Sequence, residues 1–417
     1  MNSDLPYPRH ALSTVLTALS DTPIVVVQGA RQVGKSTLVQ MIGNHQEVFT
    51  YTLDDPQTLD LALEDPRALV GAHPHSVLAI DEAQRAPGLI LPIKANVDAD
   101  RRPGRFILTG SADLLHVKGV GDSLAGRAET VEIMPLSQGE LARRDSPEDF
   151  VTWIRSGASG QDFPSLDPEL VIRGGYPEVC TRVPSRRRNW FDSYISRLSD
   201  HDARDLHSRG YADHLLVLLT HIGASGQAEF VRTSYARHLG VAESTIDGYI
   251  RTAQTMRLIQ TYKPWNRAPH KRLVKRPKVS LTDTGLSAAL NGFTTTKAMT
   301  PGGREYYGCL VEQFVALELA KQRTWTQTPY DIYHFRDLDG LEIDLVLETS
   351  DGDIIAIEVK STTTPSQKHW NPLKKLRDRF PDRSVTGILF HTGVFSAHLH
   401  NWLHVLPITA LWEHEFR

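Results

Sequence analysis

The stretch that decides the fold is GARQVGKS at residues 29–36, which follows the apolar run IVVVQ at residues 24–28. It satisfies the pattern G-x-x-x-x-G-K-[ST] between a predicted strand and a predicted helix, which is the signature of a phosphate-binding loop. Backbone N–H groups of such a loop surround a nucleotide phosphate, and the following helix adds its positive dipole end. The predicted nucleotide-binding residues are Gly29, Ala30, Arg31, Gln32, Val33, Gly34, Lys35, Ser36 and Thr37.

Individual side chains of this loop have predictable roles. Lys35 is expected to reach the β- and γ-phosphates, and Ser36 to supply a hydroxyl to Mg²⁺. The apolar run VLAI at residues 77–80 then ends in Asp81 and Glu82, an acidic pair at the carboxyl end of a strand. We expect Asp81 to hold the metal through water and Glu82 to polarise the attacking water. Because a metal-binding acid alone would suit a kinase or a GTPase equally well, the second acid favours hydrolysis of ATP.

Two further residues are candidates for the same site. The strand at residues 105–109 ends in TGS, which places Ser111, or alternatively Thr109, where a hydroxyl can sense the γ-phosphate. The segment LAGR ends in Arg127, which could project toward the phosphates of a neighbouring subunit as an arginine finger. An ordinary surface arginine is the alternative. The finger interpretation predicts a homo-oligomer.

The order of these motifs resembles that of the AAA+ ATPases, specifically the prokaryotic family with a C-terminal domain of unknown function. The similarity continues in RGGYPE at residues 173–178, WFDSYI at residues 190–195 and RDL at residues 204–206. It covers nearly the whole chain. The resemblance implies a P-loop AAA+ fold and ATP binding, and it leaves the biological role open.

The length and the pattern of elements predict several domains. At about 150 residues per domain, 417 residues correspond to two to four domains. Short apolar runs alternate with helical patterns in the first part, which indicates an α/β fold with a parallel sheet. A polar stretch at residues 143–168 marks a boundary. We predict an ATPase domain at 1–145, a helical and winged-helix domain at 165–300 and an α/β nuclease-like domain at 301–417.

The middle region has helix-turn-helix spacing, with one helix at residues 231–239, a turn at Gly240 and a second helix opened by Ser244 or Thr245. Two β-like pieces follow, at residues 258–262 and 274–281, which predicts a winged helix that binds DNA. Winged helices also bind proteins, and a charged hairpin can simply be solvated. The acid-free basic segment between the pieces contains Lys263, Arg267, Lys271, Arg272, Lys275, Arg276 and Lys278.

The last part carries a possible metal site. Alternation along the strand IIAIEVK places Glu358 and Lys360 on one face, opposite Asp344 of the preceding strand. This arrangement resembles the PD-(D/E)xK nuclease fold, which implies that Asp344 and Glu358 bind Mg²⁺, that Lys360 acts near the attacking water and that Glu312 completes the site. The usual proline before the aspartate is Ile343 here. An inactive nuclease-like fold or a set of surface ion pairs is the alternative.

Composition excludes other classes. No run approaches the roughly 18 apolar residues of a membrane span, and the N-terminus does not resemble a secretion signal, so we expect a cytoplasmic protein. Two distant cysteines exclude a disulfide scaffold, and a net charge of −3 gives no overall attraction to nucleic acid. Two hypotheses remain: an ATP-hydrolysing enzyme that acts on DNA, or an ATP-switched protein that binds nucleic acid or a protein and cuts nothing.

Overall fold

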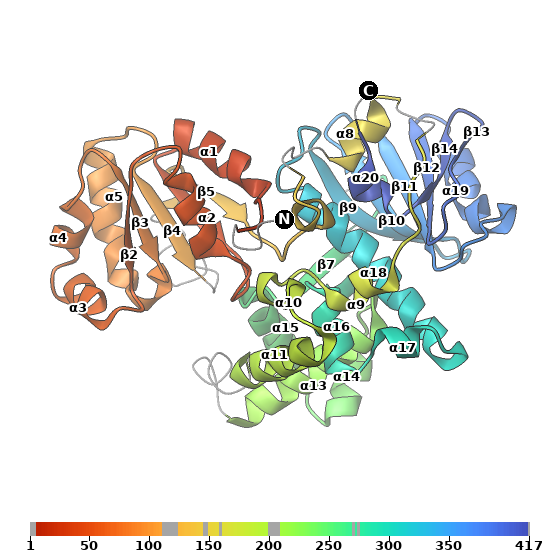
Figure 1. Cartoon of the computed structure of the whole chain (residues 1–417), viewed down its shortest axis with the longest axis horizontal. Helices are drawn as coiled ribbons and strands as arrows, with labels where there is room; N and C mark the ends of the chain where they lie inside the picture. The colour runs from red at the N-terminus through yellow and green to blue at the C-terminus, as the bar shows by residue number, and fades with distance from the viewer. Residues whose placement is uncertain are drawn as a thin grey trace. The chain divides into compact units, whose positions relative to one another are not determined.

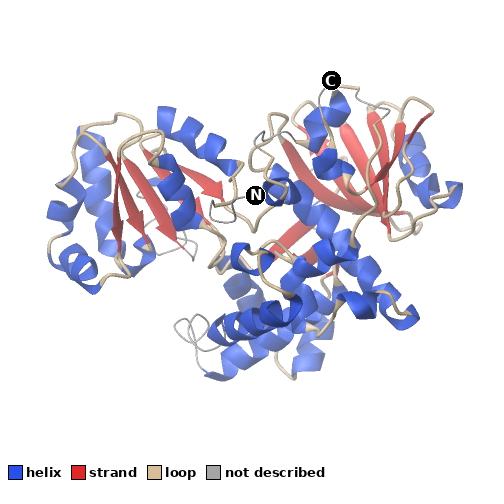
Figure 2. Ribbon diagram, viewed as in Figure 1, coloured by secondary structure: helices blue, strands red, loops and turns tan. Residues whose placement is uncertain are grey.

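The computed structural model describes residues 6–110, 124–144, 149–157, 161–198, 209–268, 272 and 276–415. They form two compact units, each built around its own β-sheet (Figures 1 and 2). The first unit comprises residues 1–136, 140–147 and 254–258, and the second comprises the remainder. Among the described residues, no helix combines the length and the apolar character that crossing a bilayer requires.

The sheet of the first unit contains five parallel strands in the order β2-β3-β4-β1-β5. The runs predicted at residues 24–28, 77–80 and 105–109 form β1, β3 and β4, and no end of these strands differs by more than one residue from the prediction. The predicted parallel α/β fold is therefore confirmed. The strands are β1 (Ile24–Gln28), β2 (Val48–Thr52), β3 (Val77–Asp81), β4 (Phe106–Gly110) and β5 (Ala128–Glu132).

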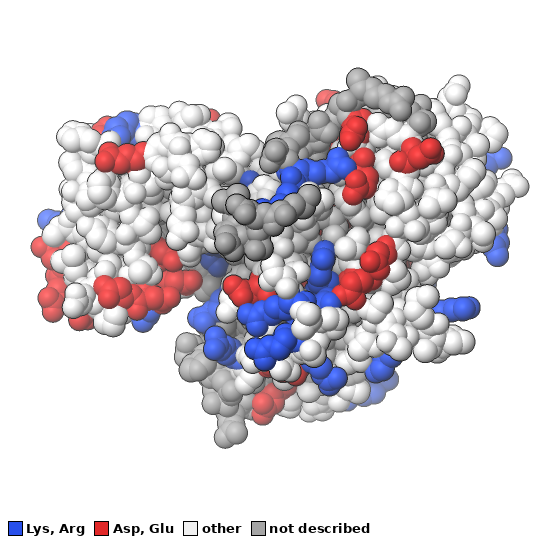
Figure 3. Space-filling view, viewed as in Figure 1, with Lys and Arg blue, Asp and Glu red and all other residues white. Residues whose placement is uncertain are grey.

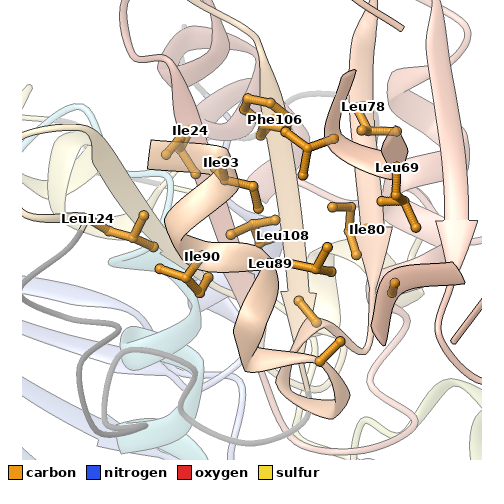
Figure 4. Close-up of a cluster of buried hydrophobic side chains, with 14 of the residues drawn as sticks. Ile24, Leu69, Leu78, Ile80, Leu89, Ile90, Ile93, Phe106, Leu108 and Leu124 are labelled. Atoms are coloured by element: carbon orange, nitrogen blue, oxygen red, sulfur yellow. The ribbon is translucent and has the colours of Figure 1, made fainter. Parts of the chain in front are cut away.

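Helices cover this sheet because its central strands β1, β3 and β4 are apolar on both faces. On one face, Ile24, Ile80 and Leu108 pack with Leu69 and Ile93 of the crossover helices in a fully buried cluster (Figure 4). Burial of such side chains stabilises the fold by about 1.5–3 kcal/mol each. The helices of the unit are α1 (Ala11–Asp21), α2 (Lys35–Ile42), α3 (Pro56–Glu64), α4 (Pro66–Gly71) and α5 (Ile90–Ala99), with short 3-10 turns at Ala83–Arg85 and Pro87–Leu89.

The parallel arrangement determines where a site can form. Because all five strands run the same way, their carboxyl ends meet at one edge of the sheet. The phosphate-binding loop follows β1 at this edge, and Asp81 ends β3. Strand β4 lies between them and contributes Thr109.

The second unit contains a nine-stranded sheet in the order β13-β14-β12-β11-β10-β9-β7-β8-β6. It runs through the boundary that the sequence predicts near residue 300, because β7 pairs in parallel with β9, with Lys263 opposite Tyr333. The middle and C-terminal regions therefore form one compact unit. Its strands are β6 (Ala228–Glu229), β7 (Ile259–Pro264), β8 (Lys278–Leu281), β9 (Tyr330–Arg336), β10 (Glu342–Thr349), β11 (Ile354–Lys360), β12 (Val385–His391), β13 (Ala397–Leu399) and β14 (Leu403–Pro407).

Helices of the middle region precede and follow the first three of these strands. The two helices predicted around Gly240 are present, and Gly240 itself has the left-handed backbone (φ 66°) that ends the first of them. Strands β7 and β8 follow as an antiparallel pair, and β6 pairs with β8. The helices are α9 (Pro168–Arg173), α10 (Pro177–Cys180), α11 (Pro184–Arg197), α13 (Arg209–Ser225), α14 (Arg232–Leu239), α15 (Glu243–Thr255), α16 (Thr284–Leu290) and α17 (Thr295–Ala298).

The polar stretch predicted as a boundary contains a helix, α8 (Phe150–Arg155), that packs within the second unit. The Asp149 side chain caps it by accepting the backbone N–H of Thr152 at 2.9 Å. The ring of Phe150 packs against Phe390 of β12. The stretch is therefore not polar throughout, because most of FVTWI is buried. The remaining helices are α7 (Gln138–Leu141), α18 (Arg304–Gln322), α19 (Gln367–Arg379) and α20 (Ala410–Glu413).

Candidate functional site

The phosphate-binding loop turns sharply between β1 and α2. Gln32 and Gly34 both have left-handed backbones, with φ of 62° and 95°. Only glycine fits at position 29, because a Cβ there would lie 2.1 Å from the carbonyl oxygen of Ile133. The loop therefore has little freedom, which is the preorganisation that backbone recognition of a phosphate requires.

The ammonium group of Lys35 lies within this loop. Its Nζ donates hydrogen bonds of 3.0 Å each to the carbonyl oxygens of Gly29 and Ala30, and the residue is 6% exposed. Burial lowers the pKa of Lys35, while the nearby carboxylates of Glu82 and Asp81 act in the opposite direction. A nucleotide phosphate would offer this buried cation a stronger partner than two neutral carbonyls.

Asp81 and Ser36 lie next to each other, as a shared metal ion requires. Ser36 Oγ donates to Asp81 Oδ2 at 3.0 Å, and Thr109 Oγ1 donates to Asp81 Oδ1. Mg²⁺ binds hydroxyl and carboxylate oxygens and keeps several waters. The donor set thus fits Mg²⁺. Thr109, the alternative sensor of the γ-phosphate, is engaged with Asp81.

Glu82 has a left-handed backbone, with φ of 55°, which is uncommon for a residue other than glycine. Such strain is typical of functional sites. The Glu82 carboxylate accepts a hydrogen bond from Nε2 of Gln84 in the following 3-10 turn. Gln84 orients Glu82, a role that sequence spacing alone did not reveal.

The sequence predicts two more residues for this site, Ser111 and Arg127. Ser111 lies outside the described residues. Arg127 precedes β5 and forms a bidentate ion pair with Asp98 of α5, with Nε–Oδ1 and Nη2–Oδ2 distances of 2.7 and 3.0 Å. The hydrogen bonds from Arg127 lower the pKa of Asp98. Arg127 would have to leave Asp98 to reach a phosphate of another subunit.

A second cluster of charged side chains lies in the C-terminal part of the second unit. Lys360 Nζ donates to Glu358 Oε2 at 2.7 Å and to Asp344 Oδ2 at 3.3 Å, so both carboxylates converge on one cation. Asp344 Oδ2 also accepts the backbone N–H of Val359 at 2.9 Å. The structure brings together the three residues that sequence alternation placed on facing strands.

Glu312 of α18 reaches the same cluster but has a different partner. Its Oε1 lies 3.1 Å from Nζ of Lys278, which is 3% exposed and also lies 3.4 Å from Glu342. The sequence places Lys278 in the basic segment and gives no signal for this ion pair. Within the described ranges, no three His, Cys, Asp or Glu side chains are grouped so that they could hold a metal ion. The carboxylate oxygens that already converge are those of Asp344 and Glu358.

Burial and crowding change the protonation of these carboxyls. Burial, together with the charge of Asp344, raises the pKa of Glu358 to about 8 and that of Glu312 to about 7. Both shifts occur although each carboxyl has a lysine partner. The cluster therefore carries excess negative charge when it is fully ionised, a condition that favours binding of a cation.

The basic segment is only partly available to a ligand. Arg267 pairs with Asp382 at 2.7 Å, and Arg272 pairs with Glu348 at 2.7 Å. Arg272 also stacks over the ring of Tyr333, 4.8 Å from its centroid. Three of the seven cations form ion pairs within the unit: Arg267, Arg272 and Lys278. Lys263 and Arg276 are exposed, and Lys271 and Lys275 lie outside the described residues.

Charge on the visible surface differs between the units. Figure 3 shows acidic side chains gathered at the end of the first unit that carries α3, where Asp54, Asp55, Asp60, Glu64 and Asp65 are exposed. Basic side chains gather around α10 of the second unit in the same view, and Arg186 and Arg188 of the following helix α11 are exposed. An anionic partner is therefore better matched by the second unit.

The RGGYPE segment has a structural explanation. Its Gly175 N–H donates at 2.7 Å to the carboxylate of Asp283, which is 1% exposed and also caps α16. A Cβ at Gly174 would lie 2.3 Å from the same carboxylate, so the close approach requires glycine. The Tyr176 hydroxyl lies 3.0 Å from that of Tyr194 in α11. The RGGYPE segment therefore holds α9 against α16. The RDL stretch at residues 204–206 lies outside the described residues.

Family models match three segments of the chain. Residues 21–142 match a model described as an AAA domain. Residues 167–297 and 307–411 match two domains of unknown function, DUF8612 and DUF4143. The last two matches meet near residue 300, where the sequence predicts a boundary and where the sheet of the second unit is continuous.

Whole-chain comparisons find relatives that match most of the chain. The uncharacterized proteins Rv2008c of Mycobacterium tuberculosis and Mb2031c of Mycobacterium bovis are each 29% identical over 362 residues, which cover 86% of this chain and 75% of theirs. Among solved structures, a Walker-type ATPase of Pyrococcus abyssi is similar at 14% identity and a TM-score of 0.44, over 69% of this chain and 99% of that chain. AMPPCP-bound DnaA from Aquifex aeolicus is similar at 14% identity and a TM-score of 0.29, over 58% and 85%.

The AAA-domain match over residues 21–142, together with the geometry of the loop, supports binding and hydrolysis of ATP. The chain contains an AAA-type ATPase domain and a C-terminal DUF4143 domain.

Proposed function

We propose that the protein hydrolyses Mg²⁺-bound ATP in its first unit and uses this reaction to control an action of its second unit on DNA. The observation that carries the first part is the 3.0 Å hydrogen bond between Ser36 and Asp81, directly beside the buried Lys35. The three groups supply a hydroxyl, a carboxylate and a cation at the end of one sheet. The substitutions Lys35→Ala and Glu82→Gln test the proposal, because their roles predict failure at different steps.

The residues of this unit have separate tasks. Lys35 and the loop amides bind the phosphates, and Ser36 and Asp81 hold Mg²⁺, which neutralises charge that develops during phosphoryl transfer. Glu82, held by Gln84, orients the water and accepts its proton. Ser111 senses the γ-phosphate, and Arg127 acts in a homo-oligomer after exchanging Asp98 for a phosphate of the neighbouring subunit.

For the second unit, nuclease-like chemistry is supported by the order α18, β9, β10, β11, α19 and β12, with β11 and β12 parallel. Asp344 and Glu358 come from the adjacent strands β10 and β11 and converge on one cation. Mg²⁺ is commonly bound by one or two carboxylates together with substrate phosphates and water. Asp344 and Glu358 would therefore hold Mg²⁺, Lys360 would supply a positive charge to a substrate phosphate, and Glu312 would be a further carboxylate of the site.

Metal binding at this site is expected to depend on Glu358 and on pH. In calorimetry of the nucleotide-free intact chain with Mg²⁺ or Mn²⁺, Glu358→Gln should weaken binding by more than about tenfold, the loss seen even for indirect metal partners. Because the raised pKa of Glu358 leaves its carboxyl protonated below about 8, affinity should increase as the pH rises through that value, and binding should release protons.

The controls separate this site from the phosphate-binding loop. Ser36→Ala removes the proposed metal hydroxyl of the loop, and Glu305→Gln removes an exposed carboxyl from the first turn of α18. Both should leave the Glu358-dependent binding unchanged. The intact chain is needed, because β9 pairs with β7 of the middle region. Equal affinity in wild type and Glu358→Gln would show that the cluster is structural.

The middle region supports a winged helix, in which α14 and α15 form the helix-turn-helix and the antiparallel strands β7 and β8 form the wing. The outward face of α15 is not basic, since it exposes Glu243 as well as Arg251. Contacts with DNA phosphates would therefore come from the basic segment and from the surface around α10 rather than from this helix.

The basic segment gives a salt-dependent prediction. Replacing Lys271, Lys275 and Arg276 together with alanine should weaken binding of duplex DNA and lower the slope of log affinity against log salt by about 0.9 for each lost contact. Arg272 is left in place because it pairs with Glu348 inside the unit. Arg267→Ala, whose guanidinium already pairs with Asp382, is the matched control. An unchanged slope would indicate that the winged helix binds protein.

A second candidate function is an ATP-switched regulator that binds nucleic acid or a protein without cutting it. Lys278 favours this candidate, because it occupies Glu312 with an ion pair where a cleaving site would leave the carboxylate to a metal or to water. Mg²⁺-dependent cleavage assays in each nucleotide state distinguish the two. Cleavage that is lost in Lys360→Ala supports the nuclease, and binding without cleavage supports the regulator.

A further inference from the structure

A buried arginine holds the phosphate-binding loop from its outer side. Arg9 precedes α1 and lies 24 positions before Val33, yet its Nη1 donates to the Val33 carbonyl oxygen at 2.8 Å. Its Nη2 donates to the carbonyl oxygen of Met134, just after β5, also at 2.8 Å. The Arg9 residue is 7% exposed. One guanidinium thus joins the loop to the segment that follows the edge strand.

The charge of Arg9 is balanced by Glu140 in the same unit. Arg9 Nε lies 3.4 Å from Glu140 Oε1, and the two side chains are 5% and 2% exposed. The same Oε1 accepts the backbone N–H of His10 at 2.8 Å. A buried ion pair of this kind contributes little net stability, but removing one partner leaves an uncompensated buried charge. Glu140 therefore fixes both the side chain and the backbone at Arg9.

The hydrogen bond from Arg9 to Val33 determines the direction of the next backbone N–H, that of Gly34. This N–H is positioned to donate a hydrogen bond to a bound phosphate. In a trans peptide the C=O and the following N–H point in opposite directions. Val33 lies between the left-handed residues Gln32 and Gly34. When Arg9 holds the Val33 carbonyl on the outside, the N–H of Gly34 is turned to the inside, where such loops bind phosphate.

We propose that Arg9 is a positioning residue for ATP: it fixes the peptide between Val33 and Gly34 in the orientation that binds phosphate, with Glu140 as its counter-ion. The proposal rests on ATP binding by the loop. Arg9 lies outside residues 21–142, which match the AAA domain, so that match assigns it no role. Only arginine provides planar, divergent donors for two carbonyls together with a charge for a carboxylate; lysine cannot serve all three partners.

The test compares Arg9→Met and Arg9→Lys with Arg105→Met in the intact chain. Arg105 is also buried, at 4% exposure, and its Nη1 donates to the Asp100 carboxylate at 2.9 Å. It directly precedes β4, at the opposite end of the sheet from the loop. Arg105→Met therefore controls for the loss of any buried arginine from this unit.

The expected result is that Arg9→Met weakens ATP and ADP binding and lowers kcat/KM for ATP by about 100-fold, the effect of a small misplacement in a binding site. Arg9→Lys should be intermediate, and it replaces Arg9→Met as the test variant if that chain does not fold. Arg105→Met should lower the melting temperature but keep the nucleotide affinity of the wild type. Equal losses of affinity in Arg9→Met and Arg105→Met would overturn the proposal.

Amide hydrogen exchange without nucleotide gives an independent readout. The Gly34 amide should exchange faster in Arg9→Met than in wild type or Arg105→Met, because the peptide is no longer held. Equal exchange in all three would overturn the role of Arg9. If the wild-type chain bound no ATP, the ATPase proposal would fail, while this exchange measurement would still decide whether Arg9 orders the loop.

Discussion

Replacement of Lys35 with alanine is expected to abolish tight binding of ATP. Lys35 provides the buried positive charge of the loop, and its present partners are the carbonyls of Gly29 and Ala30. Loss of one member of a buried, hydrogen-bonded charge pair typically costs about 2–5 kcal/mol, which corresponds to roughly 30- to 4000-fold in Kd. Equilibrium titration with ATP and with ADP in the presence of Mg²⁺ measures this loss.

The control for this variant is its stability without nucleotide. Because burial lowers the pKa of Lys35 and its ammonium donates to two neutral carbonyls, alanine should not destabilise the first unit greatly. Thermal unfolding of the nucleotide-free chain should therefore resemble that of the wild type. Unchanged affinity for ATP in a folded Lys35→Ala chain would show that the loop does not bind the β- and γ-phosphates as described.

Glu82→Gln should separate binding from hydrolysis. Glutamine keeps the size of the side chain and its contact with Gln84, but it cannot accept a proton from the attacking water. The turnover number should therefore fall by about 10²- to 10⁴-fold, the usual contribution of a general base. The Kd for ATP should stay within about twofold of the wild-type value, because the substitution removes no contact that binds ATP before the reaction.

Phosphate release and nucleotide binding must be measured on the same preparation of this variant. Glu47→Gln is a suitable control, since Glu47 is an acidic residue of the same unit that bonds Ser76 at the opposite edge of the strands. It should keep full turnover. A parallel loss of ATP binding and hydrolysis in Glu82→Gln would contradict the assignment of Glu82 to the chemical step.

Much of the first site could be predicted because its signals are local. The loop between β1 and α2 is a continuous run of residues, and Asp81 and Glu82 directly follow an apolar strand. The parallel sheet then brings these segments to one edge without further information. Arg9 has no comparable signal, because its hydrogen bond joins it to Val33, 24 positions further along the chain and outside any shared motif.

In the second unit, the sequence predicted only part of the candidate site. Alternation along two neighbouring strands correctly grouped Asp344, Glu358 and Lys360. The sequence could not reveal that Lys278 pairs with Glu312, since β8 reaches the cluster only through the sheet that β7 and β9 continue. Pairing between strands about seventy positions apart leaves no periodic pattern in the sequence. The same continuous sheet explains why part of the basic segment forms ion pairs within the unit.

The most direct test of the central claim is phosphate release from ATP by the intact wild-type chain, with and without Mg²⁺. Binding should be measured in parallel with a nucleotide that cannot be hydrolysed. We predict turnover that requires Mg²⁺ and disappears in Lys35→Ala, because Ser36, Asp81 and Lys35 act together on the bound phosphates. ATP that binds at the loop with no release of phosphate at any Mg²⁺ or protein concentration would contradict the claim that this protein is an ATPase.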